Sequence, residues 1–195
     1  MRKSAGSTLI EVLVAILLLS FTLLGIAGLL AATTRYQLGV EGRSKITLLY
    51  NDLTNRVRSN PTQSAAYVYN SASWSTQQTA IPTRVKDCSG TDASLSTCTA
   101  VERAADDLWA MRDAVRTAIP QGSLLISGDG ANGFSTTFLW FDKDTTNTDG
   151  TPLRQSLICE NINSPTPVQL HTCCPNVAAV GSTAGVRCIN FTFIL

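Results

Sequence analysis

The segment Gly6-Ser7-Thr8-Leu9-Ile10-Glu11-Val12 opens an apolar run that carries no charged residue from Val12 to Thr34. A helix needs about 20 predominantly apolar residues to cross a bilayer, and this run is long enough. Glu11 stands at the head of the run, with Arg2 and Lys3 in front of it. Because a carboxylate at the edge of hydrocarbon is costly, an acid at this position indicates a function. We therefore predict a membrane-spanning helix in which Glu11 has a functional role.

A cut after Gly6 would give that carboxylate a partner. The new α-amine of Ser7 would lie near the membrane boundary and would supply a positive charge. Glu11 of the same chain or of a neighbouring copy could pair with this amine in a setting of low dielectric constant.

The stretch from Gly6 to Ala15 resembles the processing site of type IV pilins, which usually reads G-F-T-L-I-E-V. The likeness includes the short basic leader and the glutamate at the fifth position of the mature chain. Ser7 stands where the family usually has Phe or Met. The resemblance implies cleavage between Gly6 and Ser7 by a prepilin peptidase, N-methylation of Ser7, and a role for Glu11 in subunit assembly.

A secretory signal peptide and a plain signal anchor are two alternative assignments of the N-terminus. A signal peptide has an apolar region of about 7–15 residues, whereas this run is longer and has an acid at its head. A signal anchor accounts for the length but leaves Glu11 and the Gly6-Ser7 context without a reason. The excess of positive charge expected on the cytoplasmic side of a membrane helix helps little here. Arg35, Arg43 and Lys45 follow the run and partly offset Arg2 and Lys3 in front of it.

Composition and cysteine content indicate the compartment. The chain has 195 residues, enough for a long helix and one modest domain, and its net charge is +1. Loss of Arg2 and Lys3 with a leader would change this to −1, and neither value indicates nucleic acid as an obligate partner. All six cysteines follow Asp87, and none forms a Cys-x-x-Cys pair. We therefore expect disulfides and a C-terminal domain in an oxidising compartment such as the periplasm.

The helix is expected to continue beyond the apolar run with a different character. Ile46, Leu53 and Val57 recur at helical spacing with charged residues between them, which is typical of an amphipathic helix. The segment Ser59-Asn60-Pro61 should end it, because a proline disfavours the α conformation of the residue before it. We thus divide the chain into a leader (1–6), a transmembrane half-helix (7–34), an amphipathic half-helix (35–60) and a periplasmic globular domain (61–195).

A second, shorter helix is expected after an irregular connector. The connector covers residues 62–99, with short strands predicted near 66–69 and 81–85. Asp106 and Asp107 suit a helix N-terminus, because negative charge there is favoured by the helix dipole. Leu108, Met111 and Val115 follow at helical spacing, and Pro120-Gln121-Gly122 ends the pattern. The arrangement of Asp107, Trp109, Ile119, Pro120 and Gly122 resembles the PilV group of minor pilins.

The remainder of the chain is predicted to be β structure. Residues 123–127 and 134–141 are expected to be strands on either side of the glycine-rich turn 128–133. After a polar loop at 142–150, a strand is expected at 153–160. In the last strand Ile189, Phe191, Phe193 and Leu195 should face one way. The predicted fold is α+β: the type IV pilin fold, in which the long helix packs on an antiparallel sheet of about four strands.

Disulfides account for the cysteines better than a metal site does. We favour Cys88–Cys98, since the local spacing makes this loop easy to close, and expect Cys159 and Cys188 each to pair with one of Cys173 and Cys174. A vicinal Cys173–Cys174 bond remains an alternative among the 15 pairings of six cysteines. His171 lacks the spaced cysteine pairs of a zinc site. The loop at 142–150 is rich in oxygen ligands that could bind calcium: Asp142, Asp144, Asn147 and Asp149. Their spacing does not match that of an EF-hand.

These observations favour a structural protein over an enzyme. The sequence holds one histidine and no nucleophile motif, so we expect neither catalysis, nor a metal, nor a cofactor. The resemblance implies a minor pilin of the PilV kind that spans the bacterial inner membrane once. It would help to prime pilus assembly in a tip-associated complex with other minor pilins and the major pilin. The alternatives are a pseudopilin of type II secretion and a signal-anchored periplasmic binding domain.

Overall fold

The computed structural model describes residues 9–79, 81, 83–89, 98–142, 149, 157–176 and 185–195, without the side chains of residues 35, 36 and 38–40. The chain divides into two units, Met1–Arg43 and Ser44–Leu195. The helix α1 (Leu9–Ser59) belongs to both and ends directly before Asn60-Pro61, as predicted.

In the first unit, α1 presents its apolar side chains outward. From Leu9 to Thr34 every residue is exposed. The hydroxyl groups in this stretch donate hydrogen bonds to carbonyl oxygens of the same helix, for example Ser20 to Leu17 at 2.7 Å and Thr22 to Leu19 at 2.8 Å. Such internal bonds satisfy polar groups that find no water in a bilayer.

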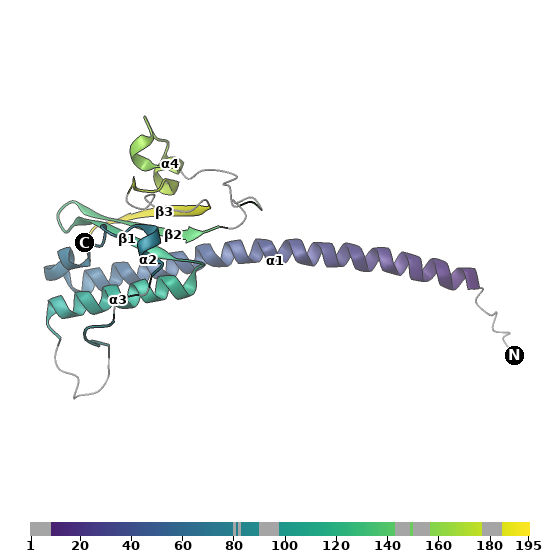
Figure 1. The fold of residues 1–195 in the computed structure, drawn as a ribbon, viewed down its shortest axis with the longest axis horizontal. Helices are drawn as coiled ribbons and strands as arrows, with labels where there is room; N and C mark the ends of the chain where they lie inside the picture. The colour runs from purple at the N-terminus through teal and green to yellow at the C-terminus, as the bar shows by residue number, and fades with distance from the viewer. Residues whose placement is uncertain are drawn as a thin grey trace. The chain divides into compact units, whose positions relative to one another are not determined.

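The second unit is built around an antiparallel sheet with the strand order β1-β2-β3 (Figure 1). The strands are β1 (Ser123–Asp129), β2 (Gly133–Phe141) and β3 (Val186–Phe193). Residues 44–59 of α1 and helix α3 (Ala100–Ala118) cover one face of the sheet. The short elements of this unit are η1 (Pro61–Tyr67), α2 (Trp74–Gln77), η3 (Cys159–Asn161) and α4 (Pro167–Thr172).

The main core lies between the two helices and the sheet. The predicted apolar faces meet there: Ile46, Leu53 and Val57 from α1 pack in the same cluster as Phe134 and Phe138 of β2. The predicted common face of β3 is confirmed for Ile189, Phe191 and Phe193, which all pack on this cluster, whereas Leu195 is 41% exposed. A smaller cluster covers the opposite face of the sheet and contains Trp74, Leu125, Leu139, Cys174, Val186 and Cys188.

The predicted start of the second helix is wrong. Helix α3 begins at Ala100, because Thr99 and Glu102 form a capping box in which each side chain accepts from the backbone N–H of the other residue. This arrangement satisfies two N–H groups that a helix end leaves without partners. Asp106 and Asp107 therefore lie inside the helix and contact other parts of the protein.

The strands predicted near 66–69, near 81–85 and at 153–160 are also wrong where the structure describes them. Residues 66 and 67 belong to η1, and Tyr69 forms only an isolated antiparallel bridge with Ile126. Residues 81 and 83–85 form no strand. Of the strand expected at 153–160, residues 153–156 lie outside the described residues. Residues 157–160 contain η3 and a single bridge, Ile158 to Cys174, since β3 takes the place beside β2. The sheet thus has three strands in the part of the chain that the structure describes.

Candidate functional site

The start of α1 and the residues before it carry the first set of predicted functional residues. Gly6 and Ser7 lie outside the described residues, while Glu11 occupies the first turn of α1 and is exposed. Among the described residues, one helical stretch, Leu9–Thr34, is long and apolar enough to cross a membrane. The sequence has no basic residue between Lys3 and Arg35, so no side chain on neighbouring turns can neutralise Glu11.

Disulfides brace the second unit at two places. Cys88 is bonded to Cys98, the pair that their spacing favours, and this bond lies next to the start of α3. Cys159 is bonded to Cys173, and Cys174 to Cys188, so the vicinal bond is not formed. The adjacent cysteines after α4 are therefore joined to two different segments, and the second bond ties α4 to β3.

Asn190 of β3 holds α4 against the sheet. Its Nδ2 donates to the carbonyl oxygens of Leu170 and Cys173, both at 2.8 Å, and its Oδ1 accepts from Thr137 Oγ1 at 2.7 Å. The Nδ1 atom of His171 lies 3.1 Å from the Asn190 carbonyl oxygen. His171 is thus in contact with the backbone of β3, and Cys173 and Cys174 are committed to disulfides. The candidate calcium ligands Asp144 and Asn147 lie outside the described residues.

Asp107 joins three elements through its two carboxylate oxygens. Oδ1 accepts from Arg56 Nη1 of α1 at 2.7 Å, and Oδ2 accepts from Tyr67 Oη of η1 at 2.7 Å. Tyr67 is fully buried. Burial, together with its hydrogen bond to Asp107, raises the pKa of the Tyr67 hydroxyl well above its ordinary value. Tyr67 therefore stays neutral and serves as a donor that fixes η1 to α3.

Asp106 and Glu102 attach the segment before the Cys88–Cys98 bond to α3. Asp106 pairs with the Arg84 guanidinium and accepts from the backbone N–H of Cys88 at 2.9 Å. Burial opposes its ionisation, but the hydrogen bonds from Arg84 and Cys88 prevail and hold the pKa of Asp106 below its usual range. The backbone N–H of Thr99 and then the ammonium group of Lys86 lower the pKa of Glu102 to about 2. The charged groups named here thus serve to hold segments together.

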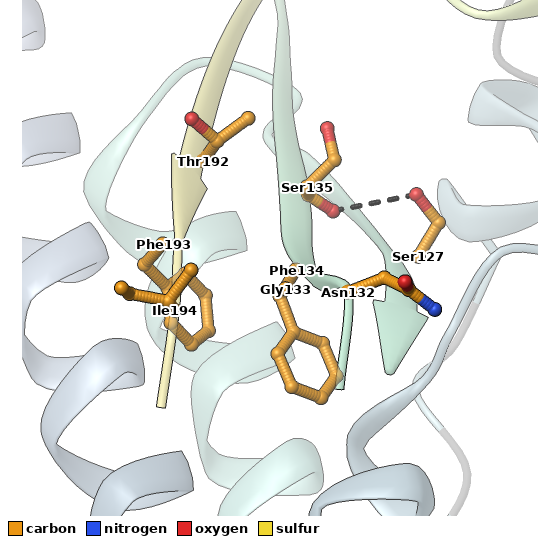
Figure 2. A pocket seen from close by; sticks show the side chains of 9 residues that line it. Ser127, Asn132, Gly133, Phe134, Ser135, Thr192, Phe193 and Ile194 are labelled. Atoms are coloured by element: carbon orange, nitrogen blue, oxygen red, sulfur yellow. Dashed lines mark hydrogen bonds between the residues drawn. The ribbon is translucent and has the colours of Figure 1, made fainter. Parts of the chain in front are cut away.

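A shallow hollow opens where the β1–β2 turn meets the end of β3 (Figure 2). Its floor is formed by Phe134 and Phe193, whose rings stack at 5.2 Å and are themselves buried. Ser127 Oγ donates to the carbonyl oxygen of Ser135 across one side, at 3.5 Å. None of the side chains that line the hollow carries a carboxyl, imidazole, amine or thiol group, so the lining holds no ordinary general acid or base.

The N-terminus is where the chain resembles known proteins. Residues 1–27 match the family described as the prokaryotic N-terminal methylation motif. This end of the chain is therefore similar to the N-terminus of type IV prepilin-like proteins. The prepilin-like motif implies processing by a prepilin peptidase, anchoring by the apolar helix and assembly with other pilins in a membrane. Comparison with curated proteins and comparison with solved structures each found no significant match.

Sequence reasoning misses the residues that hold the second unit together. Local patterns place Asp106 and Asp107 at a helix start and assign no role to Tyr67 or Asn190. The Thr99-x-x-Glu102 pattern is a signal that places the helix start correctly. The partners of Asp107 lie at sequence separations of 40 and 51 residues, where no local pattern reaches.

Proposed function

We propose that this prepilin-like chain is a minor pilin of the type IV pilus, of the PilV kind. It serves as a structural subunit that helps to prime assembly and sits in a tip-associated complex with other minor pilins and the major pilin. The observation that carries the proposal is the methylation motif at residues 1–27, with Glu11 at the head of an exposed apolar helix. The disulfide-braced α+β unit on the same chain supports it, because this is the fold that the resemblance implies.

In this proposal a prepilin peptidase cuts between Gly6 and Ser7 and removes Arg2 and Lys3 with the leader. The amine of Ser7 becomes the new N-terminus and is N-methylated. It then lies four residues before Glu11 in the sequence, close to the membrane boundary.

The protein would begin as a single-pass inner-membrane protein with its C-terminal unit in the periplasm. Three disulfides that involve all six cysteines support this orientation, because such bonds persist in an oxidising compartment. Assembly would then transfer the apolar helix from lipid into the packed core of a filament. There Glu11 would pair with the N-terminal amine of another subunit, where low dielectric constant strengthens the attraction.

A pseudopilin of type II secretion is the second candidate, since the same N-terminal motif supports it equally. The two functions differ in where the processed chain is found. Sheared surface filaments should contain the chain if it is a minor pilin, whereas a pseudopilin should be recovered only from the envelope fraction with secretion components.

Processing is tested by Gly6→Val, which should leave a full-length precursor in the membrane because the peptidase no longer finds its glycine. Gly25→Val is a matched control, since a Cβ at Gly25 meets no atom within 4 Å. Intact-mass measurement should give the precursor mass for Gly6→Val and the cleaved mass for the control. Normal cleavage of Gly6→Val would contradict the proposal.

A further inference from the structure

The outer edge of β1 is paired in an unusual way. β1 is the first strand in the sheet order, so among the described residues no further strand lies beside its outward N–H and C=O groups. Ile126 exchanges two hydrogen bonds of 2.8 Å with the backbone of Tyr69. Leu124 exchanges two hydrogen bonds with a side chain: its N–H donates to Gln77 Oε1 at 3.1 Å, and its carbonyl oxygen accepts from Gln77 Nε2 at 2.9 Å. The Gln77 amide thus reproduces the pattern of a paired residue on a fourth strand.

Gln77 is placed for this contact by the short helix α2. Its side chain is buried, and Nε2 also donates to the carbonyl oxygen of Ala72 at 3.2 Å. Trp74 Nε1 donates to the Gln121 carbonyl oxygen at 3.2 Å, and Gln78 Nε2 donates to Ser123 Oγ at 3.0 Å. Helix α2 therefore covers the β1 edge, and Gln77 bonds directly to the backbone of the strand.

The opposite edge of the sheet is closed by side chains as well. The carbonyl oxygen of Thr192 on β3 accepts from Tyr50 Oη at 2.9 Å. The carbonyl oxygen of Ile194, just beyond β3, accepts from Arg58 Nη2 at 3.0 Å. His171 contacts the next outward carbonyl oxygen, that of Asn190. An open strand edge is a template for pairing with another chain, and proteins cover or charge such edges to prevent it.

The sequence of β1 offers little protection around Leu124 and Ile126 without its cover. Residues 123–128 read Ser-Leu-Leu-Ile-Ser-Gly and contain neither a charged residue nor a proline, and the one charged residue of β1, Asp129, lies at its far end beside the β1–β2 turn. Strands of this composition pair readily once their edge is free. We propose that Gln77 acts as a latch that holds α2 over β1, and that this latch prevents antiparallel pairing of β1 with β1 of a second copy. Such a pair would be isologous, because each copy contributes the same strand.

The test compares two Gln77 variants with one matched control in the full chain in detergent micelles. Gln77→Met keeps the side-chain length and removes both hydrogen bonds to Leu124 and the one to Ala72, and Gln77→Ala also removes the packing. Gln78→Ala is the control, because it removes contacts of α2 with Gln121 and Ser123 but leaves the bonds to Leu124. Hydrogen exchange at the Leu124 amide, measured in dilute samples, should be about tenfold faster in Gln77→Met and should be unchanged in Gln78→Ala.

Measurements at higher protein concentration distinguish a contact that prevents association from one that only protects the Leu124 amide. With Gln77→Met, sedimentation should reveal two chains per micelle, and the Leu124 amide should become protected again because it bonds to the second copy. The unmodified chain and Gln78→Ala should keep the same lower assembly state throughout. Either unchanged Leu124 exchange in Gln77→Met, or faster exchange with no added association at any concentration, would overturn the proposal.

The unmodified protein provides a test that does not depend on the folding of a variant. The Gln77 side-chain NH₂ protons should exchange with solvent much more slowly than those of an exposed glutamine, because both donate to backbone carbonyl oxygens and the Gln77 side chain is buried. Exchange at the rate of an exposed amide would mean that no latch exists.

Discussion

Asp107→Ala should destabilise the second unit more than any substitution of an exposed acid on the same helix. It removes the nearer of the two acceptors of the fully buried Tyr67 hydroxyl, a charge-assisted bond of 2.7 Å, and leaves only the Arg56 carbonyl oxygen at 3.3 Å. Such a bond contributes about 1.5–3 kcal/mol. It also removes a pair with Arg56, which is one-third exposed and retains Asp52 at 3.0 Å, so that loss adds at most about 1 kcal/mol. The expected total is about 3 kcal/mol.

That loss corresponds to a fall in Tm of about 6–12 °C for a protein of this size. Tryptophan fluorescence is a suitable probe, because all three tryptophans lie in the Ser44–Leu195 unit. Asp113→Ala is the control: Asp113 is exposed on α3, and its substitution should change Tm little. A double-mutant cycle with Tyr67→Phe should give a coupling energy of about 1–2 kcal/mol. An Asp107→Ala variant that unfolds at the temperature of Asp113→Ala, or a cycle with no coupling, would refute the reasoning.

Three other predictions follow from single observations. Thr136→Val should stabilise the protein by about 1 kcal/mol in urea unfolding, because Thr136 Oγ1 is buried and has no hydrogen-bond partner among the described residues; the same change at Thr137, which donates to Asn190, should destabilise it by a similar amount. Glu11→Gln should insert into the membrane at the unmodified level but give at least about tenfold fewer crosslinks to partner pilins, because it keeps the size and loses the charge. Folding stability should fall as pH falls from about 5 toward 2, because the pKa values of Asp106 and Glu102 are lowered in the folded state and these acids must be protonated.

Each of these predictions has an outcome that contradicts it. Equal effects of valine at 136 and 137 would mean that the Thr136 hydroxyl has a partner. Normal crosslinking of Glu11→Gln and normal piliation would mean that the Glu11 charge has no role in assembly. If Asp106→Asn unfolds with the same dependence on acid as the unmodified chain, the Arg84–Asp106 pair is not a source of the acid sensitivity.

Where the sequence carries a repeated local pattern, it predicts the structure well. The uncharged run corresponds to the exposed half of α1, and the alternation around Phe134 and Phe138 places those rings on the helix-facing side of β2. The end of α1 at Ser59 follows from the geometry of a residue before proline, which is a local steric effect.

The failures arise where distant contacts decide the local structure. Asp107 favours a helix N-terminus by charge alone, but Arg56 and Tyr67 give it partners in the middle of α3. The outer position beside β1 is filled by the Gln77 side chain and one residue of a connector, so counting strand-like segments overestimates the sheet. Cysteine spacing predicts Cys88–Cys98, whereas the choice between Cys173 and Cys174 depends on how α4 lies against β3, which spacing does not determine.

The most direct test of the central claim is the intact mass and N-terminal sequence of this chain recovered from sheared surface filaments. We expect a chain that begins at Ser7, carries one N-terminal methyl group and contains three disulfides, so that its mass rises by six hydrogens on reduction. A full-length chain that begins at Met1 and stays in the membrane fraction would contradict the claim that this protein is a processed pilus subunit.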